Sequence, residues 1–308
     1  MTKKTTSLSM KRFVHTALLA LALGAAVAAA VRAEAPLTLV HVHGLSYSTD
    51  GRQLMIPSHH GLAIYSQGRW FKGEGAAHDY MGFAATRDAI YSSGHPAPNS
   101  GLINPFGLIK SRDGGRSWQK LGLEGESDFH LLAASYGTNA VYVFNTQPNS
   151  RMRQVGLHYT LDDGRTWQRA EARGLPARLH SLAVHPKDPR LVAAGTPDGL
   201  YLSRDAGQRF ERVVGGQEAL AVSFDLDGEQ LWFSSHAGQA KLWRMGLKAG
   251  AQAQSVKLPA LGEDAVAYLA QHPKRTGEIA IATFKRSVYL SPDRGGRWAQ
   301  IAKEGVTR

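Results

Sequence analysis

A short segment that recurs four times constrains this chain more than any other feature. Each copy starts with Ser or Thr, has Asp two residues later and Gly four residues later, and ends in Trp or Phe. The copies occupy residues 111–118, 160–167, 203–210 and 291–298. They recur about every 45 residues, with one double interval before the last copy, and a fixed period of this length is typical of repeat architectures.

Two further repeats complete the series. Residues 65–70 form a degenerate copy that ends in Trp70, and residues 248–254 form a Gly/Ala/Gln turn where the missing copy is due. Within each repeat, runs of four to six apolar residues alternate with Gly, Pro and Asp, which predicts short strands separated by turns. Four strands per repeat predict an all-β protein, a single β-propeller of six four-stranded blades, with seven blades as the alternative.

The recurring segment is expected to be the turn between the third and fourth strands of a blade. Its Asp accepts backbone N–H groups, its Gly adopts a positive φ angle, and its aromatic residue packs into the core. Short Asp turns of this kind satisfy the backbone, so these residues are interpreted as structural rather than catalytic. They are Asp113, Trp118, Asp162, Trp167, Asp205, Phe210, Asp293 and Trp298.

These turns resemble the Asp-box (BNR) repeats of sialidases, the sortilin ectodomain, xyloglucan-cleaving glycosidases and the photosystem II assembly propeller. The chain as a whole also resembles small secreted bacterial propellers that are labelled glycosylhydrolases. Residues 41–45, 78–83, 93–96 and 128–130 carry that second resemblance. The resemblance implies a propeller and is nearly silent on chemistry, because one fold hosts many functions.

The N-terminus has the pattern of a secretory signal. Lys3, Lys4, Lys11 and Arg12 precede an apolar run from Phe13 to Val31, and small residues follow. We expect residues 1–33 to be a signal peptide cleaved near Ala33, residues 34–308 to form the propeller, and the mature protein to be periplasmic or secreted, with no membrane span. Much of the formal charge of +11 lies in this leader. The absence of cysteine excludes disulfides and thiolate metal sites.

Histidines concentrate at one end of the predicted channel. In a propeller, the residues that start the first strand and those that end the second strand lie on the same face, opposite the Asp turns. Nine of the 13 histidines are expected there. His43, His78, His130 and His180 precede or start first strands, and His59, His60, His95 and His236 end second strands, with His41 beside His43. His185-Pro186 and His272-Pro273 have the pattern of turns at the far end.

This concentration predicts a binding site at one mouth of the channel. Two long loops on that face, residues 96–105 and 147–155, add Asn99 and Arg151. The candidate ligand-binding residues are His43, His60, His78, Asp79, His95, Asn99, His130, Arg151, His180 and His236. The candidate metal ligands are His41, His43, His78, His130 and His180, because neutral imidazole binds Cu or Zn. The alternative is a polar, wet channel in which histidines bind water.

We therefore expect a binding or assembly module that requires no cofactor, with a small ligand, glycan, metal ion or partner protein at the mouth. Lys and Arg are scattered, which disfavours nucleic acid, and we expect a monomer. The alternative function is a glycoside hydrolase, which needs two carboxyl groups that flank the scissile bond. Its candidates are Asp79, Asp128, Glu218 and Asp264, whereas the Arg-Ile-Pro segment typical of sialidases is absent.

Overall fold

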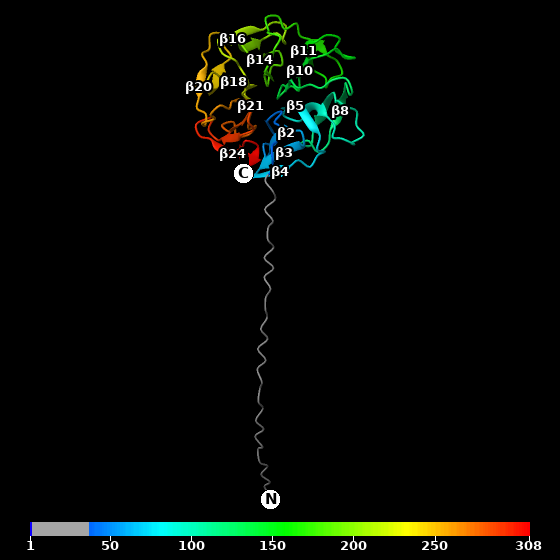
Figure 1. The fold of residues 1–308 in the computed structure, drawn as a ribbon, viewed down its shortest axis with the longest axis vertical. Helices are drawn as coiled ribbons and strands as arrows, with labels where there is room; N and C mark the ends of the chain where they lie inside the picture. Colours follow the sequence, from blue (N-terminus) through cyan, green and yellow to red (C-terminus); the bar gives the residue numbers. More distant parts are fainter. Residues whose placement is uncertain (2–36) are drawn as a thin grey trace. The chain divides into compact units, whose positions relative to one another are not determined.

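The computed structural model describes Met1 and residues 37–308. Apart from Met1, the predicted signal peptide therefore lies outside the described residues. Residues 37–308 form six antiparallel sheets arranged around a common centre (Figure 1). This arrangement confirms the six-bladed propeller over the seven-bladed alternative. No helix in the described part of the chain is both long enough and apolar enough to cross a membrane.

Each blade is a meander of sequential strands, numbered from the channel outward. The first blade contains β1 (Ser46–Tyr47), β2 (Leu54–Ser58), β3 (Gly61–Ser66) and β4 (Arg69–Lys72). The second contains β5 (Asp79–Ala85), β6 (Ile90–His95), β7 (Leu108–Ser111) and β8 (Gln119–Gly122). The third contains β9 (Leu132–Ala134), β10 (Val141–Asn145), β11 (Gly156–Thr160) and β12 (Gln168–Arg169).

The remaining blades continue the ring. The fourth contains β13 (Ser181–Val184), β14 (Val192–Thr196), β15 (Gly199–Ser203) and β16 (Glu211–Gly215). The fifth contains β17 (Val222–Phe224), β18 (Gln230–His236), β19 (Ala240–Gly246) and β20 (Gln254–Val256). The sixth contains β21 (Val266–Gln271), β22 (Ile279–Thr283), β23 (Val288–Ser291), β24 (Ala299–Lys303) and β25 (Val306–Thr307).

The burial of a strand follows its position in the blade. The second strands β2, β14 and β22 are buried at every residue, because a neighbouring blade covers each face of the sheet. The outer strands β4 and β12 are largely exposed and carry Arg, Lys and Gln. Apolar clusters accordingly lie between blades: Met55 and Ile64 of the first blade pack with Tyr80, Phe83 and Ile109 of the second. Burial of apolar area between blades is the main favourable term for this fold.

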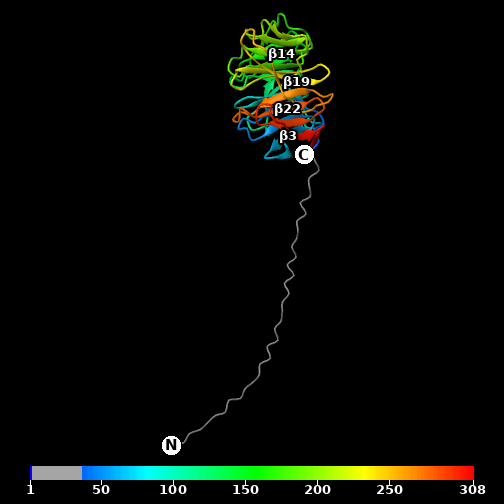
Figure 2. The same ribbon diagram turned by 90° about the vertical axis from the view of Figure 1, so that its left-hand side faces the viewer.

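The ring closes through residues from both ends of the described chain. Thr38 pairs with Val306 of β25, the Leu39 N–H donates to the Gly305 carbonyl at 2.7 Å, and the Thr307 N–H donates to the Leu37 carbonyl at 3.2 Å. The C-terminus consequently lies beside the first blade in both views (Figures 1 and 2). An N-terminal segment thus extends the sheet of the last blade.

The four recurring turns connect the third and fourth strands of blades two, three, four and six, as expected. In the first of them, Asp113 Oδ1 accepts hydrogen bonds from Ser111 Oγ at 2.8 Å and from the Ser117 N–H at 3.0 Å. The Gly115 N–H donates to Ser111 Oγ at 2.8 Å. The turns at 160–167, 203–210 and 291–298 repeat these three hydrogen bonds. The Asp side chains hold the turns together.

Candidate functional site

The innermost strands of the blades line a central channel of about 310 Å³. Most of its wall is apolar, from residues such as Leu45, Phe83, Leu132, Leu182 and Val222. His43, His130 and His180 also line it, and each lies one to three residues before the start of its blade's first strand. Turns between second and third strands lie at this same end of the antiparallel blades. The imidazoles therefore mark one mouth of the channel.

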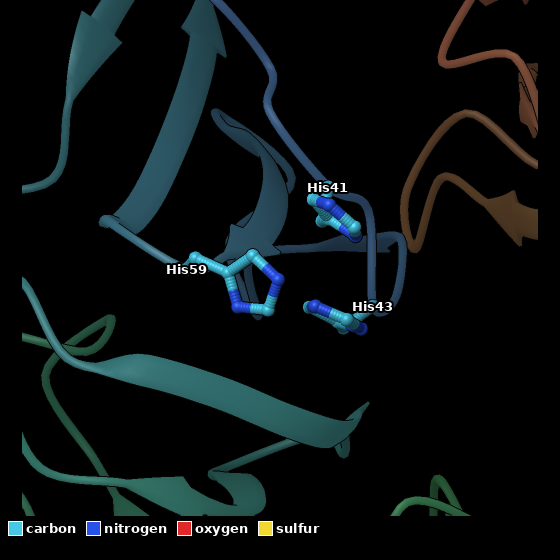
Figure 3. Close-up of side chains that lie close together, drawn as sticks. All are labelled: His41, His43 and His59. Carbon is cyan, nitrogen blue, oxygen red and sulfur yellow. The ribbon is translucent and has the colours of Figure 1, made fainter.

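Three histidines from the first blade gather at this mouth. His41 and His43 lie on the segment that leads into β1, and His59 lies in the turn between β2 and β3 (Figure 3). One candidate ligand nitrogen from each ring lies within 4.8 Å of the other two. The His41 and His59 ring centroids are 4.3 Å apart, and those of His43 and His59 are 4.8 Å apart. The three rings form a compact group of nitrogen donors.

Asp79, the first residue of β5, connects this group to the second blade. Its Oδ2 lies 2.6 Å from His59 Nδ1, and its Oδ1 lies 3.9 Å from His43 Nε2. Those last two atoms are buried and have no hydrogen-bond partner in the protein. Burial, together with repulsion from His59 and His41, outweighs Asp79 and lowers the pKa of His43 to about 4. The His43 ring is therefore neutral near pH 7, with a lone pair available to a ligand.

A second group of similar design lies one blade further on. Asp128 precedes β9, and its Oδ2 accepts hydrogen bonds from His130 Nε2 at 2.6 Å and His95 Nε2 at 3.1 Å. Asn104 Oδ1 lies 2.7 Å from His95 Nδ1. The hydrogen bond to Asp128, opposed by burial, raises the pKa of His130. Burial alone would raise the pKa of Asp128, but its histidine partners hold it below the ordinary value.

The mouth continues into blades four and five. His180 Nε2 lies 3.9 Å from Glu218 Oε2, and burial lowers the pKa of His180 despite that carboxylate. His180 Nε2, Ser181 Oγ and His236 Nε2 are buried without a hydrogen-bond partner in the protein, as is Asp128 Oδ1. Unpaired buried polar atoms are costly, so their gathering at one opening is informative.

Several residues expected at the site have other roles in the structure. His78 is buried against Tyr80 and Phe106, and its Nδ1 accepts the Ala97 N–H at 2.9 Å. The structure separates it from the three-histidine group, because it packs inside the second blade. Asp264 is also buried, and its Oδ1 accepts the N–H groups of Ala265 and Lys285 at 2.8 and 3.0 Å. Both residues stabilise the blades locally.

The two long loops differ in the contacts and exposure of their side chains. Arg151 donates to the Leu121 carbonyl at 3.2 Å and to the Gly164 carbonyl, so its guanidinium links the second and third blades. The rest of that loop is held by buried Asn149, which accepts the N–H groups of Arg151 and Met152. Asn99 lies exposed on the other loop with φ of 61°. The loop at 147–155 is thus largely structural.

The position of His59 beside His41 and His43 could not be predicted from the sequence. It was expected at the mouth together with His60, but not among the metal ligands. The two are consecutive, and spacing does not tell which ring turns toward His41 and which toward solvent. His60 is exposed, whereas His59 is half-buried. At the far end of the channel, His185 and His272 cap turns: each Nδ1 accepts two backbone N–H groups of the residues that follow.

Comparisons with known proteins extend the fold assignment. No family model matches the chain, and no curated protein matches it. Among solved structures, it is similar to a GH74 enzyme of Niastella koreensis with a TM-score of 0.57 and 14% identity, over 87% of this chain and 46% of that one. The GH74 xyloglucanase of Xanthomonas campestris has a TM-score of 0.55 and 18% identity, over 87% of this chain and 46% of that one. The chain spans less than half of these enzymes.

A third similar structure is matched over most of its length. YCF48, solved with a D1 peptide bound, has a TM-score of 0.52 and 18% identity, over 86% of this chain and 83% of that one. All of these identities are low, and the proteins that share the architecture differ in function. The comparisons therefore show that the chain has a β-propeller fold.

Proposed function

We propose that this chain is an exported binding protein whose ligand occupies the histidine-rich mouth of the central channel. The observation that carries the proposal is the set of unpaired buried polar atoms at that mouth. They belong to residues of five blades: His43, Asp79, Asp128, His180, Ser181 and His236. A ligand with several polar contacts, or a metal ion such as Cu or Zn, would satisfy them, and apolar channel walls with a few polar groups are typical of ligand sites.

Export is proposed on the sequence of residues 1–33, with the mature protein in the periplasm or secreted. The repeated turns support the proposed resemblance to Asp-box propellers, because the four turns share the same hydrogen bonds. No cofactor is needed for a binding role. The partner is proposed to be small enough to reach the mouth, as a metal ion, a small organic ligand or the end of a peptide or glycan.

Glycoside hydrolysis receives no comparable support from the carboxylates. A general acid requires a raised pKa, whereas the pKa of Asp128 is held below its ordinary value by its two histidine partners. One oxygen of Asp264 is committed to two backbone N–H groups. Asp79 is paired with His59 at 2.6 Å. A binding function, in contrast, requires no carboxyl group with a raised pKa.

A ligand screen on residues 34–308 tests the proposal. Thermal unfolding is measured with Zn(II), Cu(II), phosphate, short peptides and xyloglucan oligosaccharides as probes. We expect at least one probe to raise Tm, since a ligand at 100 times its Kd contributes about 2.7 kcal/mol. A variant with His43, His130 and His180 all changed to Ala should lose the shift. Tyr136→Phe, which alters the far end of the channel, should keep it.

Two results would contradict the proposal. The first is that no probe in the screen raises Tm of the wild-type protein. The second is that the triple variant, shown by circular dichroism to be folded, binds the stabilising probe as tightly as wild type does. Loss of the shift in Tyr136→Phe alone would move the binding site to the opposite end of the channel.

A further inference from the structure

We infer that His41, His43 and His59 bind one divalent transition metal ion, Zn(II) or Cu(II), and that Asp79 is a positioning residue for this centre. The inference rests on the proposed function, because it names the ligand of the same mouth. It differs from the sequence expectation in its ligand set: His59 enters, and His78, His130 and His180 leave. The three rings come from two segments that meet only in the folded first blade (Figure 3).

The first step is the spacing of the donors. Two nitrogens bound at about 2.0–2.1 Å to a tetrahedral Zn(II) lie roughly 3.3 Å apart. The candidate ligand atoms of the three rings already lie within 4.8 Å of one another. Metal binding would therefore draw the three donors closer together. In the described part of the chain, this is the only group of three or more His, Asp or Glu side chains whose ligand atoms lie this close together.

The second step concerns the orientation of His59. Its Nδ1 is 2.6 Å from Asp79 Oδ2, so the carboxylate occupies the Nδ1 side of the ring and Nε2 is left to bind a metal. Carboxylates that accept a hydrogen bond from a ligating imidazole fix its tautomer and its angle. Asp79 is held in turn by β5, where it pairs with His95. Asp79 therefore orients a ligand contributed by the neighbouring blade.

The third step is the choice of metal. Three imidazole nitrogens suit Zn(II) and Cu(II), whereas Ca(II) and Mg(II) require oxygen donors. The chain contains no cysteine, so thiolate cannot complete the site. Three protein ligands leave a coordination position open, and His43 lines the channel beside it. The open position would take a water or a small anion that enters from the mouth.

The test measures metal stoichiometry and affinity on residues 34–308 freed of metal. Zn(II) is titrated against a chromogenic chelator, and Cu(II) is followed by electron paramagnetic resonance. We expect one ion per chain and nitrogen hyperfine coupling from three imidazoles. His41→Ala, His43→Ala and His59→Ala should each weaken Zn(II) binding by 100-fold or more. Tyr136→Phe alters the far end of the channel, away from the group, so it should change affinity less than twofold.

Asp79 and the open position are tested separately. Asp79→Asn should keep a stoichiometry of one and the three-nitrogen Cu(II) spectrum, with affinity about 10–100-fold lower, and Asp79→Glu should restore part of the loss. Azide should change the visible spectrum of the Co(II)-loaded protein by occupying the open position. If Asp79→Asn abolishes binding as completely as His59→Ala does, Asp79 is a ligand and its positioning role is overturned.

Further outcomes would overturn the centre itself. These are the absence of stoichiometric Zn(II) and Cu(II) binding by wild type, or binding that persists in all three single variants. Failure of this inference is distinguishable from failure of the proposed function. If a phosphate, peptide or glycan probe binds and requires His130 or His180 while metals do not bind, the binding function stands and the metal centre is rejected.

Discussion

At the scale of single residues, the recurring turns contain a position that the repeat pattern left unassigned. Gly114, Asp163, Ala206 and Arg294 follow the turn Asp in their blades, and all have φ between 57° and 76°. Two of them reach back to the preceding blade. Asp163 accepts hydrogen bonds from buried Lys110 at 2.8 and 2.9 Å, and Arg294 pairs with buried Asp225. A variable position in the sequence is thus an inter-blade contact in the structure.

The Asp of the turn gives a pH prediction. Burial opposes the change, but hydrogen bonds from Ser117 and Ser111 lower the pKa of Asp113 to about 2. In the unfolded chain an Asp titrates near 3.9, so the folded state is favoured above about pH 4 and loses this contribution as pH falls through 2. Asp113→Asn should therefore be less stable than wild type at pH 7, with the difference shrinking between pH 4 and pH 2.

Urea unfolding at several pH values between 2.5 and 7 measures that difference. Glu211→Gln, an exposed carboxylate change outside the turns, is the matched control and should show a flat difference. A gap between wild type and Asp113→Asn that stays constant down to pH 2.5 would show that the carboxylate charge does not stabilise the turn.

At the scale of elements, the apolar runs and turn residues predicted four strands per repeat, and the blades have them. Even the fifth blade, which lacks the recurring turn, forms β19 and β20 around residues 247–253. The fifth strand of the last blade, β25, was not predicted, because two residues near the chain end carry no periodic signal. The aromatic residues of the turns were expected in the core, but only Phe210 is buried there. Trp118, Trp167 and Trp298 are half-buried and pack against the apolar clusters from outside. Trp298 Nε1 donates to the Lys257 carbonyl of the preceding blade at 2.8 Å.

A comparison of two turn tryptophans can separate the stability contributed by this hydrogen bond from the stability contributed by ring packing. Trp298→Phe removes a hydrogen bond worth about 1 kcal/mol along with part of the ring. Trp167 occupies the same position in the third blade, but its Nε1 is buried without a partner. Trp167→Phe should consequently cost about 1 kcal/mol less in unfolding free energy than Trp298→Phe. Equal losses in denaturant unfolding would mean that packing alone determines the contribution of these residues.

At the scale of the whole molecule, the sequence placed most histidines at one end of the channel but could not assign their partners. His59 and Asp79 are 20 positions apart and belong to different blades, and only ring geometry brings them within hydrogen-bond distance. His78, Arg151 and Asp264 were predicted at the mouth, but their side chains make contacts within or between blades. Closure of the ring through residues 37–39 could not be predicted from the sequence either, because it pairs segments from opposite ends of the described chain.

Closure and the proposed metal centre should be coupled, which gives the last prediction. His41 and His43 lie two and four residues after Leu39, whose N–H donates to the Gly305 carbonyl. A metal shared with His59 would therefore tie the closing segment to the first blade. If local opening of this segment breaks the centre, Zn(II) at 100 times its Kd should slow hydrogen exchange of the Leu39 and Thr307 amides about 100-fold. The Val192 amide in β14, far along the ring, should be unaffected, and His59→Ala should abolish the protection. Zinc-independent exchange at Leu39 in a protein that binds zinc would show that the ring closes independently of its mouth.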